Sequence, residues 1–377
     1  MVQVDLVGLI AGGQSGIPRY AVALTRALDR VAAEFPELSL RLVTTGEGAG
    51  RIAPRTLPVY EVDGARAGGG RIVAEQLAAR RSNADLLHFY DLTGPVLAPG
   101  RRFVTTMHDA AVRRGYERLR TAHKRVLQPW AIRHAAITIA VSGFARAEAI
   151  ELFGARPGAV RVVHSGPGLG NGSGPAEPAT TEAATSRHES KPFALYVGNI
   201  SEHKNLPFLI RAWERARVEA RLVLVGGRGA HFAAVERAIA ASPVRDSIEI
   251  RRDVSDAALT DLYRGAAMLL LPSRYEGFGF TSLEAMAHGC PVVESDIPAL
   301  REVSGDGARL VAPDDLDGWA DAIRLLLSDP KARRNLVTRG LETVRRYSWE
   351  ATARGVCRVL AEAGGAGVTP ASTPVGR

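Results

Sequence analysis

The sequence has few cysteines and no long apolar run, and each absence excludes a class of protein. Its two cysteines, Cys290 and Cys357, lack metal-ligand spacing, and Cys290 sits among apolar residues where a small buried thiol is expected. This usage favours a reducing compartment. No run reaches 18 apolar residues, so no membrane-spanning helix is predicted. The first residues carry no basic segment, which argues against a secretory signal. A cytoplasmic protein is therefore expected.

Size and composition leave room for two domains. The chain has 377 residues, enough for two domains of ordinary size that each bury a core. Its hydrophobic content of 46% and charged content of 23% are typical of soluble globular proteins. Alanine, arginine and glycine are abundant and lysine is scarce, which indicates a GC-rich bacterial genome.

Positive charge gathers in the first half of the chain. Residues 1–170 hold 22 basic and 14 acidic residues and the remainder holds 26 of each, so the net charge of +8 arises in the first half. The segment from Arg113 to Arg125 is the densest. A solvated helical face, a contact with an anionic surface at the inner membrane face, and a site for an acidic acceptor all fit it. Nucleic acid is not expected, because aromatic residues do not interleave with the basic ones.

Apolar runs of strand length alternate with helical patterns in both halves, which predicts an α/β protein with parallel sheets. The expected strands of the first half are residues 3–10, 40–45, 86–90, 103–108, 136–141 and 160–164. Those of the second half are residues 193–197, 221–225, 247–251, 268–271, 291–294 and 309–311. We therefore predict two doubly wound, Rossmann-like domains that face each other across a cleft.

The boundaries follow from changes in composition. We predict an N-terminal, acceptor-side domain at 1–168, a flexible linker rich in glycine, proline and small polar residues at 169–191, and a C-terminal domain at 192–348. A helix at 349–363 and a disordered tail at 364–377 follow. Ligands of open α/β sheets bind beyond the carboxyl ends of the strands, so loops of both domains should line the cleft.

The most informative stretch connects a predicted buried strand, which stops at Pro272, to a short helix that Thr281 opens and that ends near Gly289. Glu276 and Glu284 flank the glycine-rich loop. Because glycine carries no Cβ, the loop amides can approach a ligand closely, and with the helix N-terminus they favour an anion. A phosphate cradle between two carboxylates that suit hydroxyl groups predicts a nucleotide-sugar site.

A structural explanation competes for each glutamate. Thr281-Ser282-Leu283-Glu284 also fits a capping box, in which Glu284 only caps the helix. Glu276 could likewise have a purely structural role, although its place in a glycine loop after a buried strand favours function.

The segment from Ser273 to Val293, SRYEGFGFTSLEAMAHGCPVV, resembles the donor-site signature of the retaining glycosyltransferases of family 4, or group 1, which have the GT-B fold. The resemblance implies that Glu276 faces the donor sugar, that Glu284 takes the ribose hydroxyls, and that the last helix crosses back to the first domain. It implies further donor contacts from the neighbouring residues Ser273, Gly277, Phe278, Gly279, Phe280 and Leu283.

The second domain begins with a strand, a glycine and the segment Asn199-Ile200-Ser201-Glu202-His203-Lys204. A lysine placed before a helix can neutralise a phosphate, although a lysine out of context is usually a surface residue. The family places a basic pair on the donor diphosphate, and Lys204 matches one member. The arginine usual near Asn199 is missing, and Asn199 brings hydrogen bonds without charge. His203 or the first-domain loop could compensate.

Other candidate residues lie on loops of both halves. The first glycine-rich loop, residues 11–20, does not match the dinucleotide spacing Gly-x-Gly-x-x-Gly. It resembles the family's first loop, and Gly16 is the expected donor contact. His108 ends a strand beside Asp109, which could simply hold it by a hydrogen bond, whereas the resemblance implies that the histidine contacts the donor sugar. By the same resemblance Val254 lies near the nucleobase, and Asp109 and Ser142 lie on the acceptor side.

We therefore expect a retaining glycosyltransferase that moves a sugar from a nucleoside diphosphate to an acceptor hydroxyl on a cell-envelope lipid, a polysaccharide or a secondary metabolite. Lys204, the loop amides and a helix dipole would stabilise the leaving diphosphate. No metal cluster such as Asp-x-Asp lies where a divalent ion would be needed, so no metal or other cofactor is expected. A Rossmann-type oxidoreductase and a noncatalytic, basic membrane-surface protein are the alternatives.

Overall fold

A computed structural model describes residues 1–8, 16–62, 69–116, 122–168, 191–227, 229 and 231–365. Several sequence predictions fall outside these residues. They include most of the first glycine-rich loop, Arg118 and Arg120 of the basic segment, the linker at 169–190 and the tail at 366–377.

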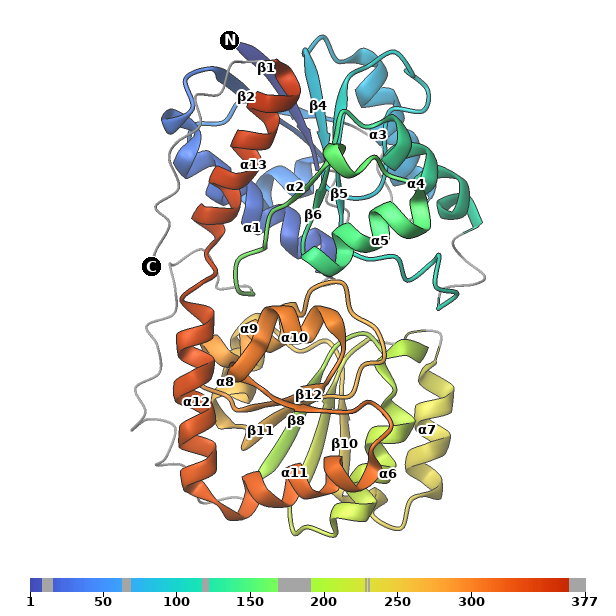
Figure 1. Ribbon diagram of the computed structural model, residues 1–377, viewed down its shortest axis with the longest axis vertical. Coiled ribbons are helices and arrows are strands. Elements are labelled where there is room, and N and C mark those ends of the chain that lie inside the picture. The colour runs from blue at the N-terminus through green and yellow to red at the C-terminus, as the bar shows by residue number, and fades with distance from the viewer. Residues whose placement is uncertain are drawn as a thin grey trace.

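The described residues form two parallel sheets, each covered by helices (Figure 1). The first has the strand order β3-β2-β1-β4-β5-β6-β7, and the second has the order β10-β9-β8-β11-β12-β13. The strands of the first sheet are β1 Val2–Val7, β2 Leu38–Thr44, β3 Val59–Glu61, β4 Leu86–Phe89, β5 Phe103–Met107, β6 Ile137–Ala140 and β7 Val160–Val162. Those of the second are β8 Phe193–Val197, β9 Arg221–Val225, β10 Ile248–Arg251, β11 Met268–Leu271, β12 Val292–Ser295 and β13 Arg309–Val311.

Helices connect most successive strands, as is usual for parallel pairing, whereas β4 and β5 are joined by a loop without a helix. In the first half they are α1 Gly16–Val31, α2 Gly46–Ile52, α3 Gly69–Arg81, α4 Ala122–His134 and α5 Gly143–Phe153. In the second half they are α6 Leu206–Ala216, α7 Phe232–Ala241, α8 Asp256–Gly265, α9 Phe280–Ala287, α10 Pro298–Ser304, α11 Leu316–Ser328 and α12 Pro330–Val344. These elements confirm the predicted GT-B architecture of two Rossmann-like units.

The final helix, α13 (Trp349–Gly364), returns to the first sheet. Figure 1 shows it leaving the second unit after α12 and running beside α1, with which it is in contact. Its apolar residues Val356, Val359 and Leu360 are buried in the core that also contains β1 and α1. The predicted crossing is thus confirmed. The helix extends one residue beyond the prediction, to Gly364. Gly364 packs on Val2 so closely that a Cβ would lie 2.7 Å from that side chain.

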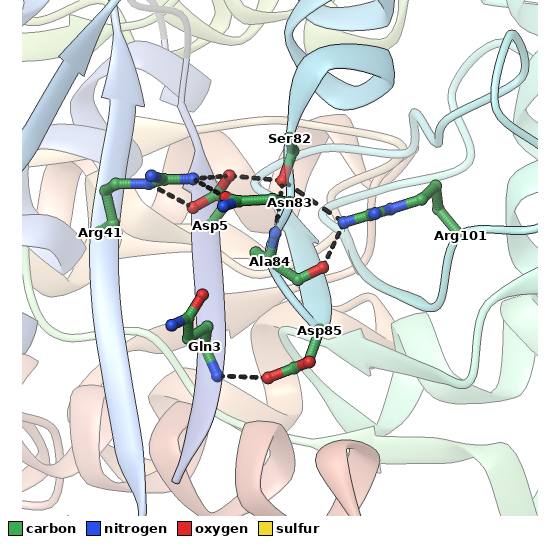
Figure 2. Close-up of polar contacts among 8 residues, drawn as sticks. All are labelled: Gln3, Asp5, Arg41, Ser82, Asn83, Ala84, Asp85 and Arg101. Carbon is green, nitrogen blue, oxygen red and sulfur yellow. Dashed lines mark hydrogen bonds and ion pairs between the residues drawn. The ribbon is translucent and has the colours of Figure 1, made fainter.

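A buried carboxylate on β1 is hydrogen-bonded to two neighbouring segments of the first unit. Asp5 of β1 is almost fully buried, and Arg41 of β2 donates to both of its oxygens, at 2.7 and 2.9 Å (Figure 2). Ser82, just after α3, donates to the same carboxylate at 2.6 Å. A buried charge is tolerated only when it is paired and hydrogen-bonded, and here the partners come from two neighbouring segments. They fix β1, from which the chain leads to α1.

The two units share apolar contacts. One hydrophobic cluster joins Met107 and Val141 of the first unit to Phe278 and Leu283 of the second. The carboxyl ends of the two sheets therefore face each other, and the loops that were predicted to carry function lie at this junction.

Candidate active site

The loop between the two glutamates folds as a strand-to-helix connection. It leaves β11 and enters α9 through Gly279, whose φ of +119° lies in a region that favours glycine. Gly279 is the N-cap of α9 and no side chain caps this helix, so the alternative explanation of Glu284 as a capping residue is wrong. Glu284 instead lies in the second turn, where it is buried and accepts a hydrogen bond of 3.0 Å from the Tyr263 hydroxyl.

Glu276 and Lys204, predicted separately, form an ion pair. Lys204 Nζ lies 2.6 Å from Glu276 Oε1, and the two side chains are only 17% and 13% exposed. Ser273 donates to the same carboxylate oxygen at 2.7 Å. Burial alone would raise the pKa of Glu276, but Lys204, His203 and Ser273 together hold it below its ordinary value. Glu276 is therefore a carboxylate at neutral pH.

The second unit touches the first at Gly277. A Cβ on this residue would stand 1.7 Å from the backbone oxygen of His108 and 2.9 Å from Asp109 Cβ. The Ser142 hydroxyl donates to the Gly277 carbonyl at 2.7 Å. Only glycine fits at this contact, which brings the end of β5 against the glutamate loop.

His108 is neutral and its tautomer is fixed by geometry. Its Nε2 lies 2.8 Å from the Tyr90 carbonyl oxygen, and because a carbonyl only accepts, Nε2 carries the proton and Nδ1 keeps a lone pair. Burial lowers the pKa of His108. Tyr20 packs edge-on against the ring at 4.5 Å. The alternative in which Asp109 holds the histidine is wrong, since Asp109 accepts from the Ala111 amide at 2.9 Å.

The other predicted residues lie on segments that follow strands or begin helices. Gly16 is the first residue of α1, and a Cβ there would meet no atom of the described residues within 4 Å. Asn199 is exposed, and Val254 is half-buried just before Ser255, the N-cap of α8. Ser142 is fully buried and caps α5, so both of its hydrogen bonds are made within the protein. Phe278, Phe280 and Leu283 pack into the apolar cluster or against it.

Sequence reasoning missed three side chains that bridge the two units. Tyr275, next to Glu276, donates to Glu148 at 2.6 Å and accepts from the Ala110 amide. Glu302 of α10 accepts from the Gly143 amide at 2.7 Å, at the start of α5. Arg19 of α1 lies 2.7 Å from Asp256 of α8. The partners are more than one hundred residues apart in sequence, and no local pattern signals such pairs.

A further buried acid lies behind the loop. Glu294 at the end of β12 is fully buried and bonds to Ser282 of α9. Burial raises its pKa to about 8, so the side chain is largely protonated at neutral pH. It adds no second charge next to Glu276. Within the described residues no three His, Cys, Asp or Glu side chains are grouped to hold a metal ion, and no helix is long and apolar enough to cross a membrane.

Two family comparisons cover most of the chain. Residues 15–167 match Glycosyltransferase Family 4, and residues 179–343 match Glycosyl transferases group 1. The O-antigen chain mannosyltransferase B of Escherichia coli is 30% identical over 364 residues, covering 89% of this chain and 93% of that protein. A D-inositol 3-phosphate glycosyltransferase of Frankia alni is 28% identical, covering 92% and 94% of the two chains.

Solved structures share the fold at low identity. Sucrose-phosphate synthase from Thermosynechococcus elongatus superposes with a TM-score of 0.73 at 19% identity, covering 97% of this chain and all of that one. Anabaena HepE in complex with UDP and glucose gives a TM-score of 0.71 at 16% identity, covering 96% and 100%.

Proposed function

The chain belongs to the glycosyltransferases of group 1 and family 4, and we propose that it moves a sugar with retention, and without a metal ion, from a nucleoside-diphosphate sugar to an acceptor hydroxyl. The observation that carries this proposal is the meeting of Lys204, Glu276 and the glycine loop of one unit with His108 of the other. Because the chain belongs to this family, we no longer consider the alternative of a Rossmann-type oxidoreductase.

The Lys204–Glu276 pair occupies the position where the donor would bind. A donor diphosphate would take over the lysine, and sugar hydroxyls would take over the carboxylate. The amides of the Gly277–Gly279 loop and the first turn of α9 would add partial positive charge. Lys204 would thus exchange one anionic partner for another, and Glu276 would exchange a charged donor for neutral hydroxyl donors.

In the proposed reaction the bond between the anomeric carbon and the β-phosphate oxygen breaks, and its electron pair leaves with the nucleoside diphosphate. The acceptor oxygen bonds to the anomeric carbon on the same face, and its proton passes to the leaving phosphate oxygen. Lys204 and the loop amides stabilise the growing negative charge, which is the role that a metal ion would otherwise fill. His108, with its free Nδ1 lone pair, holds a hydroxyl of the sugar.

The site is tested by replacing its two charged side chains singly. Glu276→Ala and Lys204→Ala are each expected to lower turnover about a hundredfold or more, since each removes an interaction with the transferring group. Glu236→Ala on α7 and Lys331→Ala on α12 remove the same charges from exposed positions and serve as matched controls. Retained turnover in both site variants would reject this assignment.

The donor is identified by a panel in which the protein is heated with GDP, UDP, ADP, dTDP or NAD. A relative aligned over most of both chains is named a mannosyltransferase, so GDP and GDP-mannose head the panel. Stabilisation by one nucleoside diphosphate and hydrolysis of its sugar conjugate are expected. Stabilisation by NAD alone would contradict a sugar-transfer function.

A membrane-bound acceptor would fit the basic segment from Arg113 to Arg125. Arg113, Arg114 and Arg125 are all exposed, and Arg114 also pairs with the buried Glu148 at 2.8 Å. Salt-sensitive pelleting with vesicles that contain phosphatidylglycerol, weakened in an Arg113→Gln/Arg125→Gln variant, is the expected result. Equal pelleting with neutral vesicles would reject the role of the basic segment, and pelleting with neither kind of vesicle would favour a soluble acceptor.

A further inference from the structure

Arg19 is a first-domain cation that reaches into the donor side of the cleft. Its Nη2 lies 2.7 Å from Asp256 at the start of α8, and its Nη1 lies 3.9 Å from Glu284 Oε1 on α9. The side chain is only 16% exposed. Both carboxylates belong to the second unit, so these two pairs exist only when the two units are together.

Among the described residues of the second unit, Lys204 is the cation assigned to the diphosphate. Lys204 is paired with Glu276, and the exposed Asn199 brings no charge where the family has an arginine. Arg19 is a cation held at the other glutamate of the loop. A guanidinium is planar and presents several donors, which suits bidentate contact with a phosphate.

We propose that Arg19 binds the phosphate next to the ribose of the donor and so replaces the missing arginine at Asn199. The inference rests on the proposed function, in which Glu284 takes the ribose hydroxyls. The α-phosphate is joined to that same ribose, so a flexible guanidinium within 4 Å of Glu284 can reach it by turning away from Asp256. Because Arg19 lies on α1, the bound donor joins the two domains through it.

The experiment compares ligands that differ only in phosphate number. Binding of a nucleoside, its monophosphate and its diphosphate, using the base that the wild-type protein selects from the panel, is measured by calorimetry. Arg19→Gln is expected to weaken diphosphate and monophosphate binding about tenfold to a hundredfold, since a hydrogen bond to a charged group is lost. Nucleoside binding should stay within about twofold, and Arg19→Lys should recover part of the loss.

Arg30→Gln is the matched control, because Arg30 lies in the last turn of the same helix and forms an exposed ion pair with Glu350. Unchanged diphosphate binding in Arg19→Gln, or an equal loss for nucleoside and diphosphate, would overturn the role of Arg19 and leave the proposed function intact. If the wild-type protein binds no nucleoside diphosphate, the proposed function fails, and this inference fails with it.

Discussion

At the scale of single residues, the two charges of the Lys204–Glu276 pair depend on each other. Glu276 is mostly buried, and its lowered pKa results from the lysine, His203 and Ser273. A carboxylate whose pKa is lowered by folding contributes stability above its unfolded pKa and loses that contribution as the pH falls through the folded value. The lysine thus affects both stability and its pH dependence.

Lys204→Ala is therefore expected to destabilise the protein by about 2–4 kcal/mol at pH 7.5, because an unpaired carboxylate remains in a buried position. Burial would then raise the pKa of Glu276 above its ordinary value. The difference from wild type should shrink at pH 4.5, where the carboxyl takes up a proton. Urea unfolding at both pH values measures this, with Lys331→Ala as the control. An equal loss at both pH values would show that charge is not the cause.

The pKa of Glu294 is shifted in the opposite direction to that of Glu276. Its folded pKa of about 8 lies above the ordinary value, so the unfolded chain ionises first and stability is lost as the pH rises from the unfolded pKa to the folded one. Glu294→Gln, which keeps an oxygen that accepts from the Ser282 hydroxyl, should raise the free energy of unfolding at pH 7 by roughly 3 kcal/mol. At pH 4 the two proteins should match. If Glu294→Gln were less stable than wild type at pH 7, the inference that Glu294 is a buried, protonated acid would be wrong.

At the scale of elements, the buried strands were the easiest to predict. Runs such as Phe103–Met107 and Met268–Leu271 are apolar throughout because both faces of a parallel sheet are covered. The sequence did not predict β3, Val59–Glu61, because this three-residue edge strand is exposed along its whole length. The segment 11–20 was predicted as a glycine-rich loop, whereas α1 begins at Gly16 within it.

The site was predicted as separate residues and not as an arrangement. The glycine loop and its glutamates form a local motif, so they could be recognised in the sequence. The Lys204–Glu276 pair joins residues 72 positions apart, and the contact of Gly277 with His108 joins different sheets. Such contacts depend on how the sheets meet, which no local pattern encodes.

The polar cluster around Asp5 gives a prediction about β1. Asp5→Ala removes an acceptor from Arg41 and Ser82 and should destabilise the protein by about 2 kcal/mol, a moderate value because Arg41 is 36% exposed and stays hydrated. Thermal unfolding measures the change. Asp85→Ala, which removes a single exposed hydrogen bond to the Gln3 amide on the same strand, is the control and should have little effect. Equal destabilisation by Asp5→Ala and Asp85→Ala would mean that the buried Asp5 cluster contributes no more to stability than an exposed hydrogen bond.

At the scale of the whole molecule, the two units are in close contact at Gly277, where a side chain would not fit. Gly277→Ala places a methyl group 1.7 Å from the His108 carbonyl oxygen, and backbone cannot move aside cheaply. We expect this variant to separate the units, enlarge the radius of gyration in X-ray scattering and lose sugar transfer. Nucleotide binding by the second unit should persist, in weakened form.

Gly50→Ala in α2 controls for the loss of a glycine, because its Cβ would meet no atom of the described part of the chain within 4 Å. A Gly277→Ala protein with wild-type dimensions and turnover would show that the contact at His108 is not needed for catalysis.

Because α13 packs on the first sheet, the core of the first unit is completed only when the end of the chain has been translated. A ribosome delivers all seven strands of that sheet, and then the whole second sheet, before it delivers Val356, Cys357 and Leu360, which belong to the core around β1 and α1. Until then the nascent chain exposes the apolar surface that this helix will cover. The half that is translated first is consequently the half that matures last.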